Sequence, residues 1–125
     1  MSRRGRGDGG QAAVELALVL PLVLVVSLAA LQVALVARDQ VLVVHAAREG
    51  ARQAAVSADD PAVERAAGAA TALDAGRLRV RIDRRRNPGQ VEVTASYVAP
   101  TAVPLIGPLV GDVGLEATVR MRFEP

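Results

Sequence analysis

Apolar and polar residues follow three patterns in succession along this chain of 125 residues. From Ala12 to Ala37 nearly every residue is apolar, and from Arg38 to Ser57 apolar residues recur at helical spacing. After Gly76, three runs alternate between apolar and polar residues. A helix that is apolar all round needs a bilayer or a large protein interior, whereas alternation indicates strands with one buried face. The pattern therefore predicts a membrane-type helix followed by a small α+β unit.

The apolar segment is long enough to cross a membrane. As a helix it would extend roughly 39 Å, and about 20 residues suffice to cross the hydrocarbon core. The rest of the chain is too small to wrap this segment, so we assign residues 11–37 to a transmembrane helix. The alternative is a secretory signal peptide with a cleavage site near Ala29. Such a peptide has a shorter apolar region, and Glu15 within the run also argues against it.

Residues 1–10 precede the span and are basic and rich in glycine. We expect them to lack regular structure. Arginines near a first span tend to stay in the cytoplasm, and this segment holds Arg3, Arg4 and Arg6. We therefore expect a single-pass protein of the cytoplasmic membrane, with its N-terminus inside and residues 38–125 outside.

Glu15 and Pro21 are the unusual residues of the span. An ionisable group inside a membrane is a functional candidate by default. The alternative is that Glu15 lies at the interface, in the first helical turn, where a negative charge suits the helix dipole. Pro21 removes a backbone donor, so we expect a kink or a locally loosened helix there.

The helix is expected to continue beyond the span, so that residues 12–57 form one long element. Its predicted buried stripe consists of Val41, Val44, Ala47, Ala51, Ala54 and Ala55. Gly50 lies within this part and would permit a close backbone approach. A second helix is expected from about Pro61 to Leu73, with Asp60 as its cap and Pro61 at its first position.

Three alternating runs, at 77–83, 91–97 and 115–123, predict an antiparallel sheet whose apolar face covers the helical stripe. Asn87-Pro88-Gly89 is a turn signal that joins the first two runs into a hairpin. The apolar segment 99–114 has no period. It either covers the core of its own domain, touches the membrane surface or contacts a partner.

Composition excludes several functions. The chain has no cysteine and a single histidine, His45, so we expect no metal site, no cofactor and no catalytic residue. All fifteen basic side chains are Arg, the net charge is only +2, and aromatic residues are almost absent. We therefore expect no nucleic-acid binding and no enzymatic activity. We interpret the basic cluster Arg84 to Arg86 as a solvated turn; a site for anionic lipid or an acidic subunit is the alternative.

Three segments resemble a known family: GQAAVELALVLPLVL at 10–24, AAREGARQAAV at 46–56 and ATVRMRFE at 117–124. They are similar to the TadE-like minor pseudopilins of the tight-adherence (Tad/Flp) type IV pilus system. The resemblance implies a leader of residues 1–10, which a prepilin peptidase cuts off between Gly10 and Gln11. It also implies a pilin-like head of residues 38–125, and other pilin or pseudopilin subunits, the Tad assembly machinery and membrane lipid as partners.

This cleavage would leave Glu15 at the fifth position of the mature chain and create a new α-amino group on Gln11. A carboxylate in low dielectric needs a positive partner, and that amine is the nearest candidate. We therefore expect Glu15 to make an assembly contact in a minor pseudopilin of an adhesive pilus or its secretion apparatus. The alternative is a permanently anchored envelope protein that assists or regulates assembly without polymerising.

Overall fold

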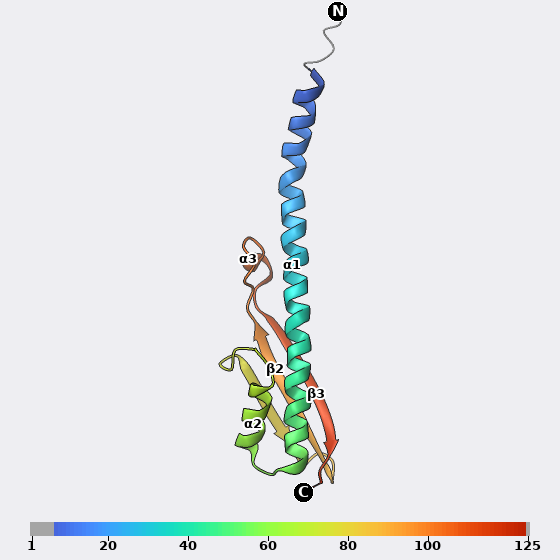
Figure 1. The fold of residues 1–125 in the computed structure, drawn as a ribbon, viewed down its shortest axis with the longest axis vertical. Helices are drawn as coiled ribbons and strands as arrows, with labels where there is room; N and C mark the ends of the chain where they lie inside the picture. The colour runs from blue at the N-terminus through green and yellow to red at the C-terminus, as the bar shows by residue number, and fades with distance from the viewer. Residues whose placement is uncertain (1–6, 125) are drawn as a thin grey trace, which may run out of the picture.

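The computed structural model describes residues 7–124, and one long helix dominates it (Figure 1). The helices are α1 (Gly7–Val56), α2 (Asp60–Ala69) and α3 (Gly107–Val110), and the strands are β1 (Leu78–Asp83), β2 (Gln90–Ala99) and β3 (Val113–Arg122). The C-terminal half of α1 packs against α2 and the sheet, while its N-terminal half projects beyond them. This α+β arrangement confirms the fold predicted from the sequence.

The projecting half of α1 is long and apolar enough to cross a membrane. Only 6% of the residues in its most apolar window are buried within the structure. This segment is therefore not the core helix of the folded head, and it suggests a single-pass membrane anchor. The helix also continues without interruption into the head, as the sequence predicts.

The structure corrects the prediction for the leader in part. Residues 7–10 form the first turn of α1 instead of lacking regular structure, whereas residues 1–6 lie outside the described part of the chain. Helix formation propagates easily from an existing helix, which helps the four residues to follow the apolar segment. Asp8 lies in this first turn, where its charge is favourable to the helix dipole.

The sheet has the strand order β1-β2-β3, and both strand pairs are antiparallel. The predicted hairpin is present, since β1 pairs directly with β2. In its turn the Gln90 N–H donates to the Asn87 carbonyl at 3.1 Å. Gly89 adopts a φ of 75° in this turn, in the left-handed region that favours glycine. Turn chemistry and alternation therefore predicted the three strands correctly.

The core lies between α1 and the inner face of the sheet. On β2 that face consists of Val91, Val93, Ala95, Tyr97 and Ala99, and on α1 the fully buried residues are Val43, Ala46, Ala47, Ala51 and Ala54. The prediction was right for Ala47, Ala51 and Ala54 but wrong for Val41, which is 58% exposed. The stripe that meets the sheet starts at Val43 and includes Gly50, so Val41 lies on another face of α1.

At Gly50 the helix lies close to two neighbouring elements. A Cβ placed there would lie 3.1 Å from Val93 Cγ1 and 3.3 Å from Ala67 Cβ. The absence of a side chain therefore lets α1 approach both β2 and α2, as expected for this glycine.

The second helix is shorter than predicted. It begins at Asp60 with Asp59, not Asp60, at the cap position, and it ends at Ala69 instead of Leu73. The Leu73 N–H donates to the Thr71 hydroxyl at 3.2 Å. Such a local side-chain bond offers the backbone an alternative to the helix, which explains the early end.

The interpretation of the basic cluster as a solvated turn holds for Arg85 and Arg86, which are exposed, but not for Arg84. Its side chain is only 27% exposed, and its Nη1 donates to the Ala54 carbonyl at 2.9 Å. Its Nη2 donates to the Ser57 carbonyl at 2.9 Å and to Asp60 Oδ1 at 3.0 Å. Arg84 thus joins the hairpin to the end of α1 and the start of α2.

Candidate functional site

The four residues singled out in the sequence lie along the projecting half of α1. Gly10, Gln11, Glu15 and Pro21 are all exposed, and α1 (dark blue to mid-blue in Figure 1) carries them away from the head. The structure brings them together only as neighbours on one helix. The site is therefore a linear feature of a helix surface, which suits contacts with a membrane or another helix.

Gln11 and Glu15 are four residues apart, so they share one face of α1. Side chains on a helix tilt toward its N-terminus. The Glu15 side chain therefore leans over the turn that holds Gln11. A positive group at the backbone nitrogen of Gln11 would lie on the side toward which the carboxylate points.

Exposed apolar side chains, including Val14, Leu16 and Leu18, surround Glu15. Within residues 7–124, no side-chain hydrogen bond or ion pair involves Glu15. A carboxylate in such a setting is tolerated in water but would need a partner in lipid. The surroundings of Glu15 are thus compatible with a contact made outside the isolated chain.

Pro21 lies inside α1, which continues unbroken through it. Proline has no N–H to donate, so the Ala17 carbonyl loses its usual helical donor. Six residues later, the Ser27 hydroxyl donates to the Val23 carbonyl at 2.8 Å. The kink at Pro21 stays a prediction.

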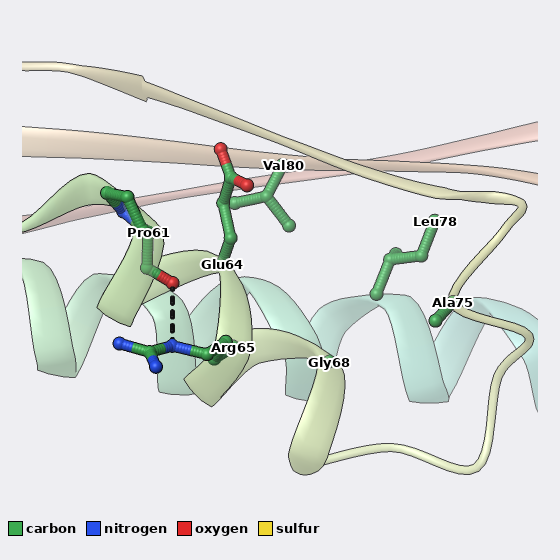
Figure 2. A pocket seen from close by; sticks show the side chains of 7 residues that line it. All are labelled: Pro61, Glu64, Arg65, Gly68, Ala75, Leu78 and Val80. Carbon is green, nitrogen blue, oxygen red and sulfur yellow. Dashed lines mark hydrogen bonds between the residues drawn. The ribbon is translucent and has the colours of Figure 1, made fainter.

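The head carries a groove of about 660 Å³ between α2 and β1 (Figure 2). Its floor includes Leu78 and Val80, and its charged residues are Glu64 and Arg65. The Arg65 Nε donates to the Pro61 carbonyl of its own helix at 3.3 Å, so its guanidinium is tied to the rim (Figure 2). Glu64 and Arg65 are the ionisable residues of the lining, which includes no serine, threonine or histidine.

Metal binding is not supported within the described part of the chain. Residues 7–124 contain no group of three or more His, Asp or Glu side chains that could hold a metal ion. The carboxylates instead make local contacts, as Glu92 does with Arg120 on the outer face of the sheet. The Glu92–Arg120 contact links β2 to β3.

A second feature, which the sequence did not reveal, lies where the loop after β2 meets α1. A cavity of about 300 Å³ is lined by Val36 of α1, by Ile106, Val110 and Val113 of the loop and β3, and by Gln32. Gln32 is 6% exposed, and its Oε1 is buried without a hydrogen-bond partner among the described residues. A glutamine in an apolar helix reveals little about its burial, because burial depends on a loop more than 60 residues away in the sequence.

Residues 10–52 match the family model of the TadE-like protein family. The match confirms the resemblance found in the sequence and suggests involvement in Tad pilus systems. The matched segment begins at Gly10 and ends inside α1. It therefore covers the projecting half of α1 and most of the part that packs against the sheet. No curated protein and no solved structure matches the chain significantly.

Proposed function

Because residues 10–52 match the TadE-like family, we propose that this protein is a minor pseudopilin of a Tad/Flp-type adhesive pilus or of its secretion apparatus. In this proposal α1 crosses the cytoplasmic membrane, with the N-terminus inside and the head outside. The observation that carries it is that the matched segment is one helix, exposed and apolar in its first half and part of the head core in its second. Such a helix can present a folded head while its apolar half packs against lipid or other helices.

The proposal includes cleavage between Gly10 and Gln11 by a prepilin peptidase. This bond lies in the first turns of α1, so the helix must unwind there before a peptidase can hold the chain extended. Gly9 and Gly10 favour unwinding, since each glycine weakens a helix by about 1 kcal/mol relative to Ala. A Cβ at either glycine would contact nothing within 4 Å, so no packing opposes the change.

The new amine on Gln11 would then be the partner of Glu15, in the same subunit or in a neighbouring one. The lean of the Glu15 side chain toward Gln11 supports the contact within one subunit. In a bundle of apolar helices, the pair would also disfavour shifts in register, because a shift would leave a charge unpaired in low dielectric. Glu15 therefore has a role in assembly and none in catalysis.

Mass spectrometry of the mature chain tests the processing step, and a mature N-terminus at Gln11 is the expected result. The assembly contact is tested with Glu15→Gln, which keeps the shape of the side chain and removes its charge. We expect this variant to be processed but largely absent from the assembled pilus or apparatus fraction. Glu49→Gln is the matched control, because it neutralises a carboxylate on the head half of the same helix. Normal incorporation of Glu15→Gln would refute the pairing.

A second candidate is a permanently anchored envelope protein that assists or regulates assembly without polymerising. The observation that favours it is the helical conformation of residues 7–10, which holds the proposed cleavage bond inside α1. An intact leader in the mature chain, together with absence from the assembled fraction, would support this candidate. The mass of the mature chain therefore separates the two functions.

A further inference from the structure

The segment between β2 and β3, residues 100–112, forms a closed and nearly uncharged loop, here called the proline loop. It contains Pro100, Pro104, Pro108 and α3, and its only charged residue is Asp112 at its end. The Thr101 hydroxyl donates to the Gly111 carbonyl, which ties the two ends of the loop together. The loop is therefore closed by a hydrogen bond and has a defined conformation.

The proline loop is buried on one side only. Val103 and Ile106 are buried, so the expectation that this segment covers the core of its own domain holds for these two residues. Leu109, in contrast, is 81% exposed, and Leu105 and Val110 are also exposed. Leu105 adopts a φ of 69°, a conformation that costs a non-glycine residue about 1 kcal/mol or more. Covering its own core therefore does not explain why this strained and exposed position carries a leucine.

The loop lies alongside the apolar half of α1. In Figure 1, α3 stands next to α1 beyond the end of the sheet, on the side toward the N-terminus of α1. Ile106 and Val110 line the same cavity as Ala29 and Val33 of α1. The polar contact between the Gln40 Nε2 and the Glu116 carbonyl, at 3.4 Å, lies on the head side of this cavity. The loop thus lies alongside residues 29–36 of α1, within the predicted span.

The depth that the loop would reach follows from the helix rise. Arg38 and Asp39 are the first charged residues after the span, and we take them to mark the headgroup region. Residues 29–33 lie five to nine positions before Arg38, which is about 7.5–13.5 Å along a helix. The interfacial region on each side of the hydrocarbon core is only about 5–7 Å thick. The tip of the loop would therefore reach the acyl chains.

The backbone of the loop is suited to this position, because unpaired N–H groups are costly in lipid. Its three prolines carry no N–H. Four further N–H groups are bonded within the segment: those of Gly107, Leu109, Val110 and Gly111, which donate to the carbonyls of Val103, Ile106, Ile106 and Gly107. Seven of the thirteen residues of the loop therefore present no free backbone donor.

We propose that the proline loop inserts Leu105, Leu109 and Val110 into the acyl-chain region of the leaflet next to the head. The head would then contact the membrane at two places, α1 and the proline loop, which would limit its rotation about the helix axis. The inference rests on the proposed function in one respect, since it requires α1 to span the membrane. Lipid fits better than a protein partner, because residues 100–111 offer no charged side chain for specific recognition and lie level with the end of the span.

The chain contains no tryptophan, so a single introduced Trp reports on one position only. The full chain is reconstituted in vesicles of phosphatidylethanolamine and phosphatidylglycerol that contain dibrominated phosphatidylcholine, because bromine quenches Trp emission on contact. The main variant is Leu109→Trp, and the high exposure of Leu109 leaves room for the ring. Leu20→Trp reports on the span, and Val56→Trp is the matched control at the far end of α1, where Val56 is also exposed.

We expect a blue-shifted emission and a loss of intensity for Leu109→Trp and Leu20→Trp, and neither for Val56→Trp. Bromines near the ester end of the acyl chains should quench Leu109→Trp most. If Leu20→Trp is not quenched, the span is absent, and both the proposed function and this inference fail. If Leu20→Trp is quenched but Leu109→Trp is not, only the insertion of the proline loop is refuted. A blue shift at Leu109→Trp without quenching would refute insertion and place the loop against another copy of this chain.

Discussion

The end of α1 depends on Arg84, and its replacement by Ala is expected to destabilise the head strongly. The last carbonyls of a helix have no donor within the helix, and Arg84 supplies one to Ala54 and one to Ser57. Hydrogen bonds to charged groups contribute about 1.5–3 kcal/mol each. The bond to Asp60 adds little, because that carboxylate is half exposed.

Two further terms modify this sum. The Arg84 Cζ lies 5.7 Å from the centre of the Phe123 ring, and such a contact contributes about 0.5–1 kcal/mol at a surface site. In the other direction, the buried Nε of Arg84 has no acceptor among the described residues, so its burial is unfavourable. We therefore expect Arg84→Ala to lower the free energy of unfolding of the head by about 3 kcal/mol.

Hydrogen exchange of the β2 amides measures this change, because buried central strands exchange mainly through opening of the whole domain. A loss of about 3 kcal/mol predicts exchange roughly a hundredfold faster, at 1.4 kcal/mol for each factor of ten. The full chain in detergent micelles is suitable, and peptides that cover residues 90–99 provide the readout. Arg85→Ala is the matched control, since the Arg85 side chain is exposed on the same hairpin. If the two variants exchange at the same rate, the role assigned to Arg84 is refuted.

Three further predictions concern packing, pH and the loop cavity. Gly50→Ala should destabilise the head by about 1 kcal/mol, because overpacking outweighs the gain in helix propensity. Gly68→Ala should stabilise the head, because nothing lies within 4 Å of a Cβ at that position. Thermal unfolding of the two variants tests both expectations. The Arg85 N–H donates to the Asp83 carboxylate and lowers the pKa of that group below its ordinary value of 3.8. The contribution of this bond to the stability of the head is therefore complete above about pH 4, and it is lost as the pH falls through the lowered pKa. Asp83→Asn should remove this acid-side loss in an unfolding series against pH. Gln32→Leu should slow exchange of the loop amides, since it removes an unpartnered buried oxygen worth about 1–3 kcal/mol, and faster exchange would contradict this reasoning.

The elements of this fold follow largely from local patterns in the sequence. Alternation predicted the three strands, and the glycine of the Asn87-Pro88-Gly89 turn predicted the hairpin, because both signals act between near neighbours in the chain. The long apolar helix was equally clear. The buried face of α1 was predicted less well. In the head, α1 carries small residues on several faces, and contact with the sheet decides which of them are buried. Val41 was misplaced for this reason, and Val43 was missed.

Individual side-chain contacts between residues that are far apart in the sequence were not predicted. Arg84 is one of three consecutive arginines, and only the packing of the hairpin against α1 selects it. Gln32 is likewise buried by a loop distant in sequence. The candidate site differs from both, because Gly10, Gln11 and Glu15 are adjacent on one helix and needed no tertiary contact to be found. The role proposed for them involves the membrane and other subunits.

The continuity of α1 has a mechanical consequence. A helix of 50 residues is about 75 Å long at 1.5 Å per residue, and within it only Pro21 interrupts the ladder of backbone donors. The head is built directly on this rod, so α1 acts as a lever. A tilt of about 10° at one end would displace the other by roughly 13 Å over that length. Small changes in how the apolar half packs would therefore be amplified into large movements of the head.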